Sequence, residues 1–314
     1  MSLEKSSRPE RIVSLPRQRL RSLATVIYNL HTPSAPAPTP ARPITVVCIS
    51  DTHTTQPILP QGDLLLHAGD LSNTGSFAEI QSQLAWLSSQ PHTYKVIIAG
   101  NHDVLLDQAF LDAFPNRIRE TPGARASDLN FGSIIYLRDD AVTLRFPKHG
   151  ADRQLTIYGS PTTPQYGTSA FQVPRDRDVW SGTVPTKTDV LLTHGPPWRH
   201  LDGVLRSGNV FLAQEIARVR PRLVVFGHIH VGYGEEEVRM DRVRSAYEAI
   251  HGGWEGRAAL LEMGLRVLWA RAMSLLPSYM RIWGTHEKAT KFVNAAVVGG
   301  EKHEYQNPPI TVYL

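Results

Sequence analysis

The chain has 314 residues, of which 41% are hydrophobic and 20% are charged, as in a globular protein long enough for a large core. Its net charge of +4 suits a phosphate-bearing substrate but is far from the basic excess of nucleic-acid-binding proteins, so no nucleic acid partner is expected. The single cysteine, Cys48, excludes an internal disulfide and favours a reducing compartment. No apolar run is long enough to span a bilayer and no signal-peptide core is present, so we expect a cytoplasmic protein.

The N-terminal segment differs in composition from the rest of the chain. Residues 1–22 are rich in Arg and Ser, as in a mitochondrial presequence, but two glutamates and a proline argue against that assignment. Prolines recur over residues 32–43, which favours an extended spacer without a packed core. We therefore expect residues 1–43 to form a basic, Pro-rich and poorly ordered tail, followed by one folded domain over residues 44–314.

Predicted strands and helices alternate after this tail. Apolar runs and period-two patterns predict strands over Ile44–Ser50, Asp63–Ala68, Tyr94–Ala99, Ser133–Leu137, Ala141–Arg145, Gln154–Tyr158, Asp189–Thr193, Arg222–Phe226, Lys291–Val298 and Ile310–Leu314. The three strands between residues 133 and 158 have the pattern of a meander. Helices are predicted after a capping box at Ser76–Glu79, over Asp103–Phe114 and over Val210–Arg218.

An insertion at about residues 238–288 has helical composition between Ala258 and Leu276. Glu262 and Arg266 are four residues apart there, so they can pair on the helix surface. Two interpretations stay open: a helix docked on the domain, or a peripheral contact of residues 245–284 with a membrane surface or a second copy. The residues that favour such a contact are Trp269, Trp283, Arg257, Arg271 and Arg281. The oligomeric state stays open.

Five short motifs follow apolar runs that are predicted to be strands. In chain order they are Asp51-Thr-His53, Gly69-Asp70, Gly100-Asn-His-Asp103, Thr193-His-Gly195 and Gly227-His-Ile-His230. Because ligands gather at the carboxyl ends of strands in open α/β sheets, these carboxylates, amide and imidazoles are expected to converge. Such donors suit Mn²⁺, Fe or Zn²⁺, so the motifs predict a site for two divalent metal ions. The remaining histidines are predicted to be solvated or structural, with His67 packing under the site.

The motifs resemble the signature of the calcineurin-like metallophosphoesterase superfamily. Further stretches are similar to its metallophosphoesterase-domain-containing, UPF0046-like subfamily, among them Tyr158-Gly-Ser-Pro161, Leu192-Thr-His-Gly-Pro-Pro197 and Gly227–Gly234. This resemblance implies an α/β fold, a four-layer α-β-β-α sandwich of two mixed sheets. It also implies a first metal ion held by Asp51, His53, Asp70 and His230. A second ion would be held by Asp70, Asn101, His194 and His228.

The expected function is a metal-dependent phosphoester hydrolase, with cyclic nucleotides among its substrates if it is a phosphodiesterase. A hydroxide activated by the two metal ions would attack phosphorus, and His102, outside the metal shell, would donate a proton to the leaving group. Whether Asp103, a backbone carbonyl or a residue across the site orients His102 stays open. Aromatic residues that could stack on a base are Tyr166, Trp180, Trp198 and Tyr233. The alternatives are a phosphomonoesterase or protein phosphatase, and a non-catalytic scaffold with the same fold.

Overall fold

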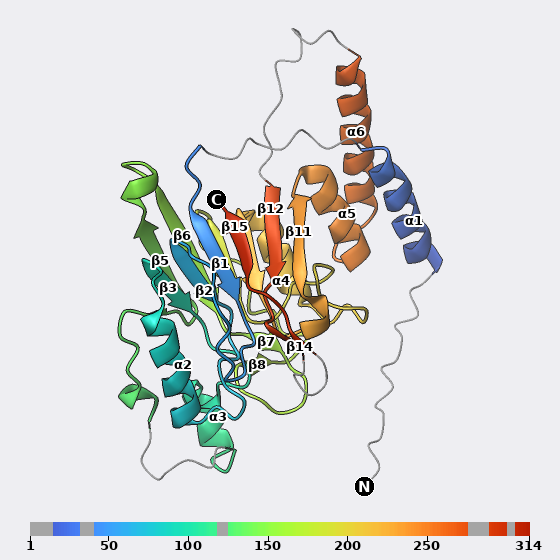
Figure 1. Ribbon diagram of the computed structural model, residues 1–314. Coiled ribbons are helices and arrows are strands. Elements are labelled where there is room, and N and C mark those ends of the chain that lie inside the picture. The colour runs from blue at the N-terminus through green and yellow to red at the C-terminus, as the bar shows by residue number, and fades with distance from the viewer. Residues whose placement is uncertain (1–14, 32–40, 118–124, 276–288, 300–304) are drawn as a thin grey trace. The chain divides into compact units, whose positions relative to one another are not determined.

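The computed structural model describes residues 15–31, 41–117, 125–275, 289–299 and 305–314. The chain divides into two units (Figure 1). An α/β unit is built from residues 36–238 and 288–314, and a helical unit from residues 1–35 and 239–287.

The first sheet of the α/β unit has five strands. Their order across the sheet is β15 (Ile310–Tyr313), β1 (Thr45–Ile49), β2 (Leu64–His67), β3 (Tyr94–Ile97) and β4 (Ile135–Tyr136). Strands β1 to β4 are parallel, and β15 pairs antiparallel with β1. The carboxyl ends of β1, β2 and β3 therefore meet at one edge, where three of the five motifs begin.

The second sheet has six strands, in the order β11 (Gly234–Arg239), β12 (Ala289–Asn294), β10 (Leu223–Phe226), β9 (Val190–Thr193), β6 (Gln154–Ser160) and β5 (Asp140–Arg145). Strands β12, β10, β9 and β6 are parallel, and β5 is antiparallel to β6. Two short ladders lie outside the sheets, β7 (Thr163–Pro164) with β8 (Gln172–Val173) and β13 (Val298–Gly299) with β14 (Tyr305–Gln306).

The two sheets enclose one hydrophobic core, and helices cover their outer faces. In β1, Val46 and Cys48 belong to the core between the sheets, whereas Val47 and Ile49 point the other way, under α2 (Phe77–Ser89). Burial on both faces explains why the strand sequence is a continuous apolar run. Each such side chain contributes about 1.5–3 kcal/mol by leaving water. The unit is thus the expected four-layer sandwich of two mixed sheets.

Helix α2 begins at Ser76, whose side chain accepts a hydrogen bond from the Glu79 N–H at 3.3 Å. The Glu79 carboxylate in turn accepts from the Thr74 N–H at 2.8 Å, so the helix start also holds the preceding loop. The expected helix over 103–114 is instead a 3-10 turn, Val104–Leu106, followed by α3 (Gln108–Ala113). The side chain of Asp107 caps α3 and separates the two pieces. Further 3-10 turns span Ala126–Asp128, Pro147–His149 and His230–Gly232.

Helix α4 (Val210–Val219) agrees with its predicted range and connects β9 to β10. Because these strands are parallel neighbours and the space between the sheets is filled, α4 lies on the outer face of the second sheet. The predicted meander was wrong. Strand β4 joins the first sheet whereas β5 and β6 join the second, since a period of two shows which face is buried but not which sheet receives the strand.

The helical unit contains α1 (Leu15–Asn29), α5 (Arg242–Gly252) and α6 (Arg257–Ser274). Part of the segment expected to be a disordered tail is therefore helical. It is ordered by a small core in which Ala24 of α1 meets Ile250 of α5 and Met263 of α6. Glu262 and Arg266 pair at 2.7 Å, as their spacing predicted. Trp283 and Arg281 lie outside the described residues. In the described part of the chain, no helix combines the length and apolarity needed to cross a bilayer.

Candidate metal centre

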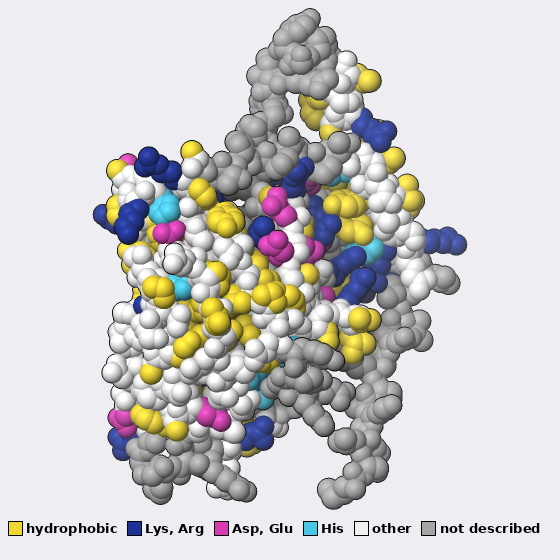
Figure 2. Space-filling model, viewed as in Figure 1, with side chains coloured by type: hydrophobic (Ala, Val, Ile, Leu, Met, Phe, Trp, Pro, Cys, Tyr) yellow, Lys and Arg dark blue, Asp and Glu magenta, His cyan; other side chains and the backbone are white. Residues whose placement is uncertain are grey.

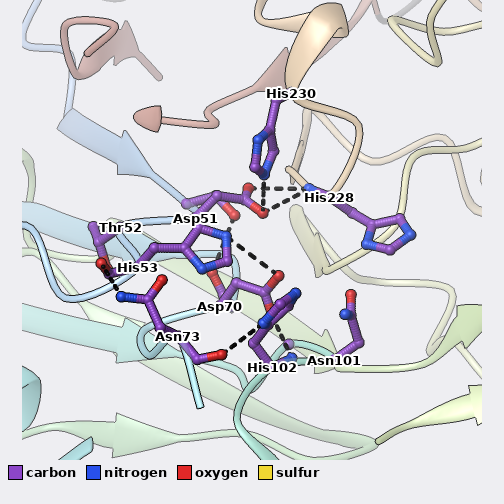
Figure 3. A network of polar contacts seen from close by, with 12 residues as sticks. Asp51, Thr52, His53, Asp70, Asn73, Asn101, His102, His228 and His230 are labelled. Atoms are coloured by element: carbon purple, nitrogen blue, oxygen red, sulfur yellow. Dashed lines mark hydrogen bonds and ion pairs between the residues drawn. The ribbon is translucent and has the colours of Figure 1, made fainter. Parts of the chain in front are cut away.

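The five motifs lie in the loops at the carboxyl ends of β1, β2, β3, β9 and β10, and their side chains point toward one another (Figure 3). Four of the predicted ligands have left-handed backbone conformations: Asp51, His53, Asp70 and His228, with φ between 43° and 65°. Non-glycine residues rarely adopt this conformation, and its clustering is typical of functional sites.

Asp51, His53 and His230 form one candidate metal-binding group, with ligand atoms all within 4.8 Å of one another. The Nε2 atom of His230 lies 3.2 Å from Oδ1 of Asp51. The Asp51 carboxylate also accepts the backbone N–H of His228, at 3.0 and 3.1 Å to its two oxygens. The end of β1 is thereby tied to the loop that supplies both histidines of the last motif.

Asp70, His194 and His228 form a second group of the same kind. The Nε2 atom of His194 lies 3.3 Å from Oδ2 of Asp70 and 3.1 Å from Oδ1 of Asn101. The same Oδ2 of Asp70 lies 3.8 Å from Nε2 of His53, which belongs to the first group. Asp70 therefore stands between the two groups, where one carboxylate can serve two cations.

Backbone carbonyls orient the imidazoles from behind. Nδ1 of His53 lies 3.2 Å from the carbonyl of Ser72, and Nδ1 of His194 lies 2.8 Å from that of Ala68. A carbonyl can only accept, so each Nδ1 carries the proton and each Nε2 lone pair faces the site. This orientation from outside the ligand shell is typical of metal-binding histidines.

Electrostatic coupling inside the site is strong because its acids and imidazoles are buried together. Burial would raise the pKa of Asp70, but the charge of His194 overcomes it and holds that pKa well below the usual range. Burial likewise opposes protonation of His194, and Asp70 raises its pKa to about 9. Burial lowers the pKa of His228 to about 4, so this imidazole is neutral. A proton on His194 thus balances the carboxylates where a cation would otherwise do so.

The donor set fits two divalent cations. Each group offers one carboxylate and two imidazoles, Asn101 adds an amide oxygen, and Asp70 lies next to both groups. Carboxylate oxygen and neutral imidazole nitrogen are the donors used by Mn²⁺, Fe and Zn²⁺. The structure brings all seven predicted ligands together, and their assignment to metal ions stays a prediction.

His102 lies beside the first group. Its ring meets that of His53 edge-on at 4.9 Å between centroids, and its N–H donates to Oδ1 of Asp70 at 2.8 Å. Nδ1 of His102 lies 2.8 Å from the carbonyl of Asn73. The side chain of Asn73 in turn donates to the carbonyl of His53 at 3.1 Å. A backbone carbonyl therefore orients His102, which was one of the open alternatives.

Sequence reasoning missed the part played by Asp103. One of its oxygens accepts from the N–H groups of Leu71 and Gly100, and the other from the N–H and hydroxyl of Ser72. Burial and the nearby Asp70 charge raise its pKa to about 6. Asp103 joins the loop after β2 to the loop after β3. Its place next to Asn101 and His102 was the only sequence signal for it.

The other predicted residues lie as follows. His67 is buried under the site, where its Nδ1 accepts from the Gly69 N–H and its Nε2 lies 3.0 Å from the Thr52 hydroxyl. Trp180 is only 2% exposed, so it cannot stack on a substrate base, and that expectation was wrong. Tyr166, in contrast, is 77% exposed. His286 and His303 lie outside the described residues.

Comparison with known proteins identifies the class that this site defines. The sequence model of the calcineurin-like phosphoesterase family matches residues 44–232. The chain is 40% identical over 290 residues to the probable rhamnogalacturonate lyase C of Emericella nidulans, covering 90% of this chain and 26% of that protein. It is 39% identical over 217 residues to metallophosphoesterase domain-containing protein 1 of Homo sapiens, covering 63% and 64%.

The UPF0046 protein T07D4.2 of Caenorhabditis elegans is 35% identical over 225 residues, which cover 62% of this chain and 54% of that protein. A solved structure, that of TT1561 of Thermus thermophilus, aligns over 63% of this chain and 85% of its own with a TM-score of 0.39 and 14% identity. The chain thus spans about a quarter of the first relative and just under two thirds of the second. It belongs to the calcineurin-like phosphoesterase family, which confirms the resemblance seen in the motifs.

Proposed function

We propose that the chain is a metal-dependent phosphoester hydrolase that acts on diesters. The observation that carries this proposal is the kind of charge around the site. The groups that shift the pKa values of Asp51, Asp70, His194, His228 and His230 are all Asp and His. A phosphomonoester dianion gains from additional cationic side chains such as Arg, whereas a diester carries a single negative charge. This difference favours a diester.

Two divalent cations bound there would supply a nucleophile derived from water near neutral pH and neutralise charge on the phosphoryl group. The residues that would hold them are Asp51, His53, Asp70 and His230 for one, and Asp70, Asn101, His194 and His228 for the other. The chain itself supplies the remaining task, which is to protonate the leaving group.

We assign that task to His102. Its Nδ1–H is committed to the carbonyl of Asn73, so Nε2 is the nitrogen left for the substrate. When the ring is protonated, Nε2–H can donate to the departing alkoxide oxygen, a step that is typically worth about 10²–10⁴ in rate. The bond from the His102 N–H to Asp70 keeps this ring next to the ligand groups.

A hydrolysis panel tests the proposal. Bis-p-nitrophenyl phosphate, p-nitrophenyl phosphate and 2′,3′- and 3′,5′-cyclic nucleotides are incubated with the protein loaded with Mn²⁺, Fe or Zn²⁺, and metal content is measured on the same samples. We expect kcat/KM for the diester to exceed that for the monoester by about tenfold or more, and Asn101→Ala to abolish both activities. A preference for the monoester would favour the phosphatase alternative.

A metal-loaded protein that cleaves none of these esters would favour the non-catalytic scaffold. The lyase named for the Emericella nidulans relative is not proposed here, because this chain matches 26% of that protein. A cytoplasmic location is also proposed, and the buried free thiol of Cys48 is in keeping with a reducing compartment.

A further inference from the structure

Helix α6 is apolar on two opposite faces. Its buried residues are Ala259, Met263 and Val267, which pack in the core of the helical unit. Its exposed apolar residues are Leu261, Leu265, Leu268 and Trp269, each between 66% and 69% exposed. Because these four are spaced by four, three and one residues, they form one stripe along the helix, here called the outer face of α6.

Helix α1 of the same unit carries a similar stripe. Its members are Leu23, Val26 and Leu30, which are 54%, 58% and 44% exposed. The two helices are neighbours, since Arg271 of α6 donates to the carbonyl of Leu30 at 3.2 Å. Large apolar side chains gathered on one small unit are uncommon on the surface of a monomer and mark an interaction site.

Charge decides which partner suits these stripes. The segments of the helical unit, residues 1–35 and 239–287, contain 13 Lys and Arg and seven Asp and Glu, a net charge of +6. The rest of the chain has 20 basic and 22 acidic residues, a net charge of −2. A second copy would bring +6 against +6, whereas an anionic surface is attracted to the same charge.

Basic side chains also line a pocket of about 330 Å³ in the helical unit. Arg17 and Arg21 reach it from α1 and Arg257 from the start of α6, together with Trp254 and one acid, Glu255. Figure 2 shows hydrophobic and basic side chains side by side on the surface of this unit. Arginine next to exposed tryptophan and leucine is the composition of segments that lie at a lipid–water interface.

We propose that the helical unit docks the protein on an anionic phospholipid surface. The outer face of α6 and the stripe of α1 enter the boundary between headgroups and acyl chains, and the arginines contact the lipid phosphates. The unit lies on the bilayer, because no helix among the described residues can cross it. This inference is independent of the reaction catalysed by the α/β unit, and the family model ends at residue 232, before the second part of the helical unit begins.

Sedimentation of the full chain with lipid vesicles tests this proposal. One set of vesicles is pure phosphatidylcholine and the other contains added phosphatidylserine, both at about 0.1 M salt. We expect the anionic vesicles to bind about tenfold or more tightly, and binding to weaken as the salt is raised. Leu265→Ser and Leu268→Ser together should lower the partition coefficient about tenfold or more, because each removes apolar area that enters the bilayer.

The matched control is Ile58→Ser, since Ile58 is 94% exposed but lies in the α/β unit. It should bind vesicles like the unchanged protein, and thermal unfolding should show that all variants are folded. Equal binding to both vesicle types, no binding, or a leucine variant that still binds fully would overturn the proposal. A concentration-dependent dimer that the same leucine variant dissolves, without vesicle binding, would assign the face to a second copy instead.

Discussion

Replacing Gly227 by Ala should remove metal binding while leaving the fold intact. A Cβ atom at this position would lie 1.9 Å from Oδ2 of Asp51 and 2.2 Å from Oγ of Ser50. Cβ atoms almost never lie closer than 3.0 Å to such a neighbour, so the carboxylate must retreat by about 1 Å. The backbone of Gly227 itself does not need a positive φ, so alanine meets no strain there.

The magnitude follows from how narrowly a metal site tolerates its ligands. Metal–oxygen distances vary by about 0.2 Å, so a shift of about 1 Å takes Asp51 out of the ligand set. The shift also breaks its hydrogen bonds from the His228 N–H. A misplacement of this size near reacting atoms typically costs about 10²-fold in rate. The fold should lose only about 1–3 kcal/mol, because the clash is with side chains that can move.

The assay combines metal content, diester hydrolysis and thermal unfolding of the Gly227→Ala protein. Gly256→Ala is the matched control, since a Cβ there meets nothing within 4 Å and should change none of the three readouts. Gly100→Ala makes a useful contrast, because its Cβ would lie 2.3 Å from the backbone nitrogen of Asp70 and should lower stability as well. A Gly227→Ala protein with full metal content and normal turnover would refute this reasoning.

Three further outcomes are expected. Because the pKa of His194 is raised from 6.5 to about 9, a cation must displace its proton, so metal affinity should rise about tenfold per pH unit up to about pH 9, and a flat profile in a competition titration would contradict this. In the metal-free protein the same raised pKa stabilises the fold by on the order of 3 kcal/mol below pH 6.5, and this is lost as the pH rises through about 9, while the lowered pKa of Asp70 adds stability above its ordinary value of 3.8 that disappears on acidification, both visible as a falling Tm. His102→Ala should slow an ester with a poor leaving group by about 10²–10⁴ but spare a p-nitrophenyl ester and the metal content, and equal losses on both substrates would remove His102 from the acid role. Glu79→Ala should lower kcat without metal loss, because the Glu79 carboxylate accepts from the N–H groups of Asn73 and Thr74 and so holds the loop whose carbonyl orients His102; an unchanged kcat would show that this loop needs no such support.

The elements nearest the site were predictable because each one combines a local pattern with a local burial state. Strands β1, β2, β3, β9 and β10 are buried on both faces, and a strand buried on both faces needs a continuous apolar run. The motifs could be placed at the ends of these runs for the same reason. The identity of the candidate ligands is therefore readable from the chain.

Contacts between distant segments were not predictable in the same way. The chain between residues 133 and 158 shows a period of two in both sheets alike, so it could not reveal that β4 and β5 belong to different ones. Helix α1 lies in a segment whose composition suggests a tail, and it is ordered only by apolar partners more than 200 residues away. The burial of Trp180 likewise depends on which loops cover it.

The amino-acid sequence by itself determined the family, the class of fold and which side chains carry the chemistry, because residue type, spacing and hydrophobic period are all local. Only the tertiary structure decided that the carbonyl of Asn73 orients His102, that Asp103 joins two loops, and that α6 keeps an exposed apolar face. The physical reason is that hydrogen-bond partners and solvent exposure arise from which segments meet, and the free energy of that packing is shared among residues far apart in the chain.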